Sequence, residues 1–207
     1  MQSVSSGTGT LAQQLIPREG ILSRPLVLDT LLVVGGSLFV ALSAQISIPL
    51  APFSPVPITG QTLGVLLVGS LIGPRLGILA LLLYLLQGAI GLPFYAGGAS
   101  GWQQLRGATA GYLVAFPLAA GLSGWLAARG WDRRFGSALL AMLLSNALIY
   151  LLGAAWLATF IGVEQAITRG VLPFLPGDAL KIALASAALP GGWQLLRALR
   201  RSDEREA

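Results

Sequence analysis

The chain has 207 residues, of which 55% are hydrophobic and 10% are charged, and its mean hydropathy is +0.76. A soluble domain carries about 25% charged residues, so the composition indicates an integral membrane protein. Cysteine and histidine are absent, which excludes disulfides and zinc or haem sites built on those residues. The net charge of +5 does not indicate nucleic-acid binding, because it arises from scarce acids and from arginines at the ends of apolar segments.

The chain opens with a polar stretch, residues 1–24, that is rich in Ser, Gly, Thr and Gln. It lacks the basic region and apolar core of a cleaved signal peptide, so we expect a cytoplasmic tail with room for a short surface helix. Residues 25–197 then form the predicted membrane domain, and residues 198–207 form a charged cytoplasmic tail. Six apolar segments are predicted as spans of about 20 residues, one of them short: 26–48, 59–72, 76–90, 109–128, 137–161 and 178–196.

Two long connections interrupt these segments. Residues 48–59 contain four prolines, which forbid a regular helix and favour an extended, semi-rigid loop. Residues 91–106 are rich in glycine, which permits unusual backbone conformations and close approach of the backbone to a ligand. The aromatic residues Phe94, Tyr95 and Trp102 within this second loop favour a packed structure over a flexible linker.

The distribution of basic residues predicts the orientation in the membrane. If the N-terminus is cytoplasmic, ten of the thirteen basic residues lie inside, and only Arg106, Arg169 and Lys181 lie outside. By the positive-inside rule we predict an all-α integral membrane protein with six transmembrane helices and both termini cytoplasmic. The two long loops and the start of the last segment then share the outer face.

The last apolar segment opens with Leu175-Pro176-Gly177-Asp178-Ala179-Leu180-Lys181, which contains the only lysine of the chain. At a spacing of three residues, the Asp178 and Lys181 side chains share one helix face. One interpretation is a helix cap with a local ion pair. The other is a ligand site, because ionisable residues at membrane depth are costly and usually functional.

Further polar and aromatic groups gather on the predicted outer elements: Thr59, Gln61, Thr62, Tyr95, Trp102, Gln103, Gln104, Arg106 and Tyr112. Polar groups in the middle of the spans are few: Gln45, Tyr84, Gln87, Ser145 and Asn146. Since no series of carboxylates crosses the bilayer, the pattern favours an outward-facing small-molecule pocket over an ion path. Such groups suit a flat, uncharged ring with one acidic arm, because a Lys or Arg binds a carboxylate and Asp178 accepts from N–H donors.

No P-loop sequence is present, and no set of nucleophile, base and metal ligands indicates an enzyme. We therefore predict no catalytic residues, no metal site and no bound cofactor, and active uptake would need an ATP-hydrolysing partner.

Several motifs, taken together and in this order, resemble the BioY family, the biotin-binding S components of energy-coupling factor (ECF) vitamin transporters. The first loop and second segment carry Ser47-Ile48-Pro49 and Pro55-Val56-Pro57-Ile58-Thr59-Gly60-Gln61-Thr62-Leu63-Gly64-Val65-Leu66. Then follow Leu71-Ile72-Gly73-Pro74-Arg75-Leu76-Gly77, Gly88-Ala89-Ile90-Gly91-Leu92-Pro93, Ala96-Gly97-Gly98, Thr109-Ala110-Gly111-Tyr112-Leu113 and the motif of the last segment. The resemblance extends from Leu38 to Ala187.

The resemblance implies a multi-pass protein of the cell (inner or plasma) membrane that binds biotin near its outer face, in contact with lipid and without nucleic acid. The Asp and Lys that contact the ligand in the family match Asp178 and Lys181. Motif position adds Gly97, Gly98 and Tyr112 as candidates, and Gln61, one of the polar groups of the outer elements, is a further candidate. The biotin carboxylate would be bound by Lys181 or by Arg106. The family's usual Gly-Pro-Thr is here Gly107-Ala108-Thr109, without the proline.

The resemblance also implies partners, namely a membrane-embedded T protein and a pair of ATPases that bind the ATP. The docking face in the family is a stripe of small residues on the first helix, which Gly36, Ser37, Ala41 and Ala44 would fit. Packing within the chain is an equally good interpretation of each of these four residues. Alternatives for the function are an S component for another vitamin, a stand-alone secondary transporter and a membrane enzyme acting on a lipid head group.

Overall fold

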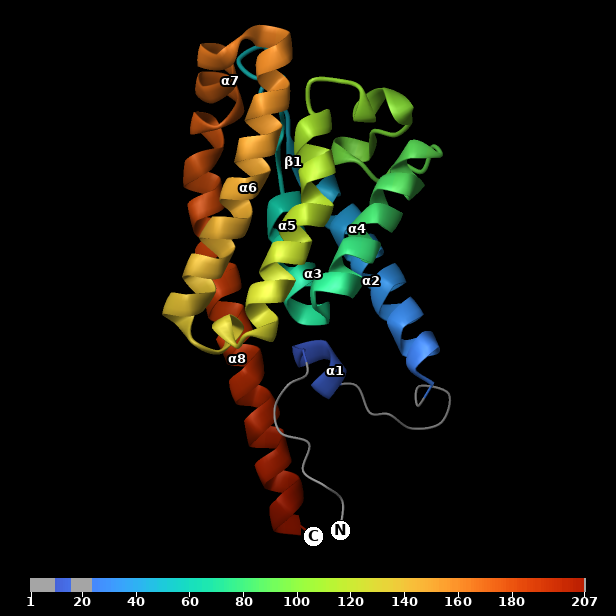
Figure 1. The fold of residues 1–207 in the computed structure, drawn as a ribbon, viewed down its shortest axis with the longest axis vertical. Coiled ribbons are helices and arrows are strands. Elements are labelled where there is room, and N and C mark those ends of the chain that lie inside the picture. The colour runs from blue at the N-terminus through green and yellow to red at the C-terminus, as the bar shows by residue number, and fades with distance from the viewer. Residues whose placement is uncertain (1–9, 16–23, 207) are drawn as a thin grey trace.

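The computed structural model describes residues 10–15 and 24–206. The regular structure of these residues is almost entirely helical, and the longer helices form a bundle (Figure 1). The α-helices are α1 (Leu11–Leu15), α2 (Pro25–Gln45), α3 (Gln61–Ile72), α4 (Pro74–Ala89), α5 (Ala110–Ala128), α6 (Phe135–Ile161), α7 (Val163–Gly170) and α8 (Leu175–Glu206). Short 3-10 helices lie in the connections: η2 (Ala96–Gly98), η3 (Trp102–Leu105), η4 (Trp131–Arg133) and η5 (Leu172–Phe174).

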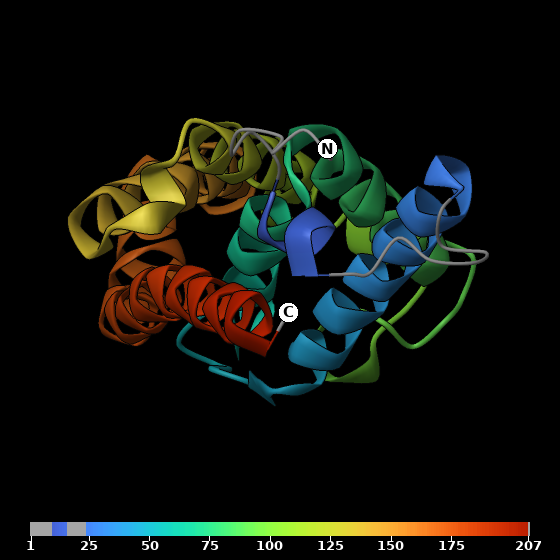
Figure 2. The ribbon, with the colours of Figure 1, turned by 90° about the horizontal axis from the view of Figure 1, so that it is seen from below.

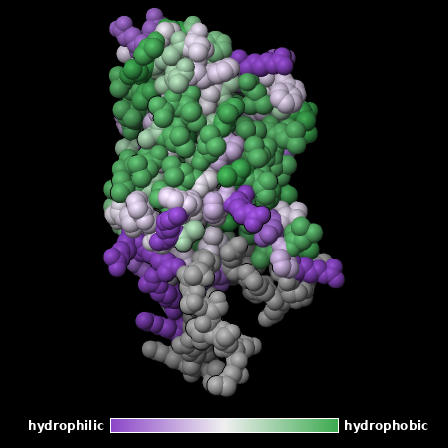
Figure 3. Space-filling model, viewed as in Figure 1, coloured by the Kyte–Doolittle hydropathy of each residue, from purple (hydrophilic) through white to green (hydrophobic). Residues whose placement is uncertain are grey.

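The predicted apolar segments correspond to α2, α3, α4, α5, α6 and α8, with ends that differ by a few residues. Among the described residues, four stretches are long and apolar enough to cross a membrane: α2, α5, α6 and the stretch 163–199, which includes most of α8. The helices α3 and α4 are apolar but shorter. Hydrophobic residues cover the middle of the face in Figure 3, and hydrophilic residues gather toward its ends. These features confirm the predicted all-α membrane fold.

The connections hold structure that the sequence pattern did not predict. The strands β1 (Ser47–Ile48) and β2 (Ile58–Thr59) pair antiparallel and tie together the two ends of the proline-rich loop. The amphipathic helix α7 separates α6 from α8. The helix α8 starts at Leu175, so Asp178 lies in its first turn and not at the N-cap. It continues through Pro190, since a proline is tolerated in a membrane helix when neighbouring groups satisfy the freed backbone.

The helix α5 lies at the centre of the bundle, packed against α3, α4 and α6. Its closest approach to α3 depends on two glycines. A Cβ atom on Gly69 would overlap the carbonyl oxygen of Ala120 and Oγ of Ser123, and one on Gly124 would lie 2.6 Å from the carbonyl oxygen of Gly69. Small residues allow membrane helices to pack backbone against backbone, so this contact fixes the spacing of the two helices.

The small-residue stripe of α2 faces the chain's own bundle. Gly36, Ser37, Ala41 and Ala44 are all buried, and a Cβ atom on Gly36 would lie 3.0 Å from Val68 Cγ1 and 3.1 Å from Ala80 Cβ. In this conformation the stripe therefore packs within the chain and is not exposed for docking.

The end of the bundle that carries α1 is tied together by α8 (Figure 2). Leu11 of α1 packs with Trp193 and Leu196 of α8. The indole Nε1 of Trp193 donates a 2.6 Å hydrogen bond to Oδ2 of the buried Asp132 in η4. Burial raises the pKa of the Asp132 carboxyl, and the hydrogen bond from Trp193 opposes this shift.

We expect Gly69→Leu to lower the free energy of unfolding in detergent by about 1–3 kcal/mol, because the larger side chain overpacks the contact between α3 and α5. The matched control is Gly35→Ala, since nothing lies within 4 Å of a Cβ atom at Gly35 in α2. Thermal unfolding of both variants is the measurement. A Gly69→Leu protein as stable as the Gly35→Ala protein would contradict this packing.

Candidate ligand-binding site

A cavity of about 180 Å³ lies among α3, α5, α6, α8 and the two long loops, at the opposite end of the bundle from α1. One wall is the proline-rich loop and another is the glycine-rich loop. The lining residues are Pro55, Val56, Pro57, Thr59, Gln61, Thr62, Tyr95, Ala96, Ala99, Gln104, Thr109, Tyr112, Leu113, Phe116, Ile149, Tyr150, Gly170, Phe174, Asp178 and Lys181. The structure thus brings together segments that are more than 100 residues apart in the sequence.

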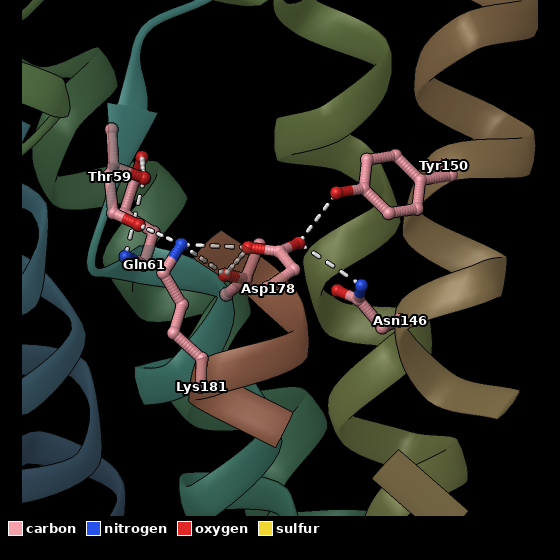
Figure 4. A network of polar contacts seen from close by, with 7 residues as sticks. Thr59, Gln61, Asn146, Tyr150, Asp178 and Lys181 are labelled. Carbon is pink, nitrogen blue, oxygen red and sulfur yellow. Dashed lines mark hydrogen bonds and ion pairs between the residues drawn. The ribbon is translucent and has the colours of Figure 1, made fainter. Parts of the chain in front are cut away.

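The carboxylate of Asp178 is the centre of the polar contacts in this cavity (Figure 4). Its Oδ1 accepts from Lys181 Nζ at 2.7 Å and from Thr62 Oγ1 at 3.2 Å. Its Oδ2 accepts from the Tyr150 hydroxyl at 2.7 Å and from Asn146 Nδ2 at 3.1 Å. A carboxylate offers about four lone-pair positions, so these donors fill its capacity and compensate for the burial of its charge.

The ammonium group of Lys181 is satisfied in the same way. Besides the ion pair with Asp178, its Nζ donates to the Thr59 carbonyl oxygen at 2.6 Å and to Thr62 Oγ1 at 3.2 Å. A lysine ammonium has three N–H donors, and each has an acceptor here. The pair therefore contributes no net charge to the cavity.

Local sequence explains why these groups meet. The pairing of β1 with β2 returns the chain to the bundle, so that Thr59 and Thr62 lie at the start of α3. In α6, Asn146 and Tyr150 are four residues apart and so point from one helix face. In α8, Asp178 and Lys181 are three residues apart within its first two turns.

Two other predicted site residues line the cavity but are bonded within the protein. The Tyr112 hydroxyl donates to the Gly170 carbonyl oxygen at 2.8 Å. Gln61 donates from Nε2 to the Tyr84 hydroxyl at 2.6 Å and accepts from Thr59 Oγ1 at 3.0 Å. Both residues therefore fix the wall of the cavity, and Tyr112 also presents its ring there.

Three predicted site residues do not line the cavity. Gly97 and Gly98 are exposed, and their φ angles of 64° and 82° are left-handed, a conformation that glycine adopts at little cost. They form the turn that places Tyr95, Ala96 and Ala99 in the lining. Arg106 is exposed and lies two residues after Gln104, which does line the cavity.

The main contribution that the sequence pattern did not reveal comes from α6. The sequence pattern indicates Asn146 only as a polar group in the middle of a span, and it does not single out Tyr150. Their spacing of four residues on an apolar helix is a signal that could have found them, because it places both polar groups on one face. Asn146 Oδ1 is buried and accepts no hydrogen bond among the described residues.

The arrangement suits capture of a small molecule. Polar groups gather around Asp178, whereas aromatic and aliphatic side chains such as Phe116, Ile149 and Phe174 form other parts of the lining. Ligand sites commonly combine apolar walls with a few convergent polar groups. Among the described residues, no group of three or more acidic side chains is arranged to bind a metal ion.

Comparison with known proteins gives a consistent result. The model of the BioY family matches residues 13–198. A probable biotin transporter BioY of Pyrococcus horikoshii is 42% identical over 152 residues, which cover 72% of this chain and 88% of the relative. A biotin transporter BioY of Rhizobium etli is 37% identical over 188 residues, which cover 85% of this chain and 98% of the relative.

A solved structure is also similar. It is the crystal structure at 2.1 Å of the S-component for biotin from an ECF-type ABC transporter. The two structures align with a TM-score of 0.69 and 26% sequence identity, over 86% of this chain and 93% of the solved chain.

We expect Asp178→Asn and Lys181→Met each to lower the free energy of unfolding by about 3 kcal/mol, because each leaves a buried charge without its partner. The double variant should recover much of this loss, since it removes both charges. Thermal unfolding in detergent without ligand measures the three variants. Additive losses in the double variant would contradict the coupling.

Proposed function

Because this chain belongs to the BioY family, a family of transporters and not of enzymes, we propose that it is the biotin-binding S component of an ECF-type vitamin transporter. The observation that carries the proposal is the cavity beside the first turns of α8, where the buried Asp178, paired with the partly buried Lys181, meets donors from α3 and α6. The relatives are named as biotin transporters, and the similar solved structure is named as an S-component for biotin.

In this proposal the protein lies in the plasma membrane with both termini in the cytoplasm. The concentration of basic residues at the end that carries α1 supports this orientation, since cytoplasmic ends of spans are rich in Lys and Arg. The cavity then faces outward, where biotin would enter past the proline-rich and glycine-rich loops.

The ureido ring of biotin is neutral, flat and rich in hydrogen-bonding groups, so it matches the neutral polar cluster around Asp178. Its N–H groups would take acceptor positions on Asp178 that Tyr150 and Thr62 now occupy. Both of these residues carry hydroxyls, which donate and accept, so they can turn toward the ureido oxygen. The apolar part of the bicyclic ring would pack against Phe116 and Ile149.

The valerate carboxylate needs a cation, and we assign it to Arg106 in preference to Lys181. All three donors of Lys181 already have acceptors within the protein. Arg106 is exposed and lies two residues after Gln104, which lines the cavity. Its guanidinium has donors arranged to bind a carboxylate with two hydrogen bonds. Biotin would then lie with its ring near Asp178 and its acidic arm toward the loops.

Transport would require the other subunits of an ECF system. The chain carries no P-loop sequence, so ATP would be bound and hydrolysed by separate ATPases. A membrane-embedded T protein would couple them to this chain and reorient it to release biotin inward.

We expect purified protein in detergent to bind one biotin per chain, with weaker binding of desthiobiotin and none of thiamine. Asp178→Asn and Lys181→Ala should each weaken biotin binding by about 2–5 kcal/mol, because each leaves its partner buried and unpaired. Isothermal titration calorimetry measures these affinities. Asp132→Asn is the matched control, since it alters a buried carboxylate at the other end of the bundle. Biotin affinities within threefold of wild type in both site variants would refute the assignment.

The assignment of the carboxylate has its own test. We expect Arg106→Ala to weaken biotin binding about tenfold, or about 1.4 kcal/mol, and to leave binding of biotin methyl ester unchanged. Arg169→Ala serves as the control, because Arg169 is another exposed arginine at the same end. Equal losses for biotin and its ester in Arg106→Ala would assign this residue a role in loop structure instead.

A further inference from the structure

A second hollow of the molecule, separate from the biotin cavity, lies between α2 and α4. It has a volume of about 820 Å³ and shares no lining residue with the first cavity. Figure 1 shows α2 crossing α4, with its first turns leaning away from the other helices. The lining residues are Thr10, Leu26, Asp29, Thr30, Val33, Val34, Ile72, Gly73, Pro74, Arg75, Leu76, Leu79, Leu82, Leu83 and Leu86. We call this hollow the α2–α4 groove.

The apolar part of the α2–α4 groove has the dimensions of one leaflet. From Arg75 to Leu86 the helix α4 advances eleven residues, or about 16 Å. One leaflet contributes about 15 Å to the hydrocarbon core of a bilayer. Leu79, Leu82 and Leu86 are about half exposed along this length, so the groove offers an acyl chain a continuous apolar path.

The charged part of the groove consists of one acid and one base, and the uncharged polar residues Thr10 and Thr30 also line the groove. Asp29 and Arg75 both line it, yet they form no ion pair or hydrogen bond with each other. In the part of the chain that the structure describes, neither side chain has any hydrogen-bond or ion-pair partner. Charged groups near a membrane normally find a partner, so these two opposite charges are available to a ligand in the groove.

Helix stability does not explain the position of Arg75. It lies in the first turn of α4, where the helix dipole disfavours a cation. The positive-inside rule accounts for an arginine at this end of the bundle, but it does not account for Asp29 in the same groove. A ligand that carries both charges would satisfy both residues.

We propose that the α2–α4 groove binds a phospholipid with a zwitterionic ethanolamine head group, from the same leaflet as α1. The phosphate would meet the Arg75 guanidinium, the ammonium would meet the Asp29 carboxylate, and an acyl chain would follow Leu79, Leu82 and Leu86. A purely anionic head group would leave Asp29 unpaired or repelled. A choline head group has no N–H donor, so it cannot hydrogen-bond to the carboxylate.

The test compares phospholipids that share the same acyl chains and differ in the head group. Purified protein is titrated with phosphatidylethanolamine, its mono- and dimethylated forms, phosphatidylcholine and phosphatidylglycerol, and bound lipid is counted by mass spectrometry of the intact complex. We expect phosphatidylethanolamine to bind about tenfold more tightly than phosphatidylcholine or phosphatidylglycerol. Affinity should fall with each added methyl group, because each methyl removes an N–H donor.

Substitutions of Asp29 and Arg75 then test which residue binds the ammonium and which binds the phosphate of the head group. Asp29→Asn should abolish the preference for ethanolamine over choline, and Asp29→Lys should make phosphatidylglycerol the preferred lipid. Arg75→Gln should weaken binding of all the phospholipids several-fold. Arg129→Gln is the matched control, because Arg129 lies at the same end but stacks on the Trp125 ring at 3.3 Å, outside the groove. Biotin titration of the same variants should be unchanged, so this proposal and the proposed function can fail independently.

Two results would overturn the proposal. Equal binding of all the head groups by the unmodified protein would show that the groove is only an apolar surface that any lipid, or a partner helix, can cover. A preference for ethanolamine that survives both Asp29→Asn and Arg75→Gln would place the lipid elsewhere. The methylation series needs no variant, so it decides the question even if a substituted protein fails to fold.

Discussion

The site depends on one constraint, which is that a carboxylate buried in an apolar bundle must have its charge compensated from every side. Asp178 satisfies this constraint with four donors from three helices. Each donor can reach it only if α3, α6 and the first turn of α8 converge at one point. The polar cluster therefore does more than line a cavity, because it specifies how these helices lie relative to one another.

In the proposed function, the same charge compensation would determine which ligands the Asp178 cluster can recognise. A cluster in which every donor of Lys181 and every acceptor position of Asp178 is already used has no free charge to attract an ion. In the proposed function, the Asp178–Lys181 pair would bind a ligand by exchanging internal hydrogen bonds for bonds to a ligand of similar polarity. Since the exchanged groups at Thr62 and Tyr150 are hydroxyls, they can adopt new partners without leaving a buried group unsatisfied. In the proposed function, selectivity for a neutral, hydrogen-bonding ring would follow from this requirement.

The helices could be predicted from the sequence because each apolar segment is a local signal, and the Asp178–Lys181 pair could be singled out because charge is so rare. The cavity walls could not be predicted in this way. Which face of α6 turns inward depends on its packing, and so the role of Tyr150 was not evident. The same ambiguity applies to Gly36 and its small neighbours on α2, since a small residue allows close approach of any helix, from this chain or another. The short helix α7 was missed because its polar sequence resembles a loop.

The helix α8 connects the two ends of the molecule. It begins with the Asp178 cluster and, fifteen residues or about 22 Å further on, it carries Trp193, which bonds to Asp132 and packs on Leu11. An α-helix transmits displacement because its backbone hydrogen bonds resist stretching, so α8 cannot shift along its axis at one end alone. Any movement that rearranges the Asp178 cluster must therefore be absorbed at the Trp193 contact or by bending of α8. Pro190 lies between the two ends, and a proline is the position at which a helix bends most readily. The polar contacts at each end and the proline between them thus determine how far a rearrangement in the cavity displaces α8 at the other end of the bundle.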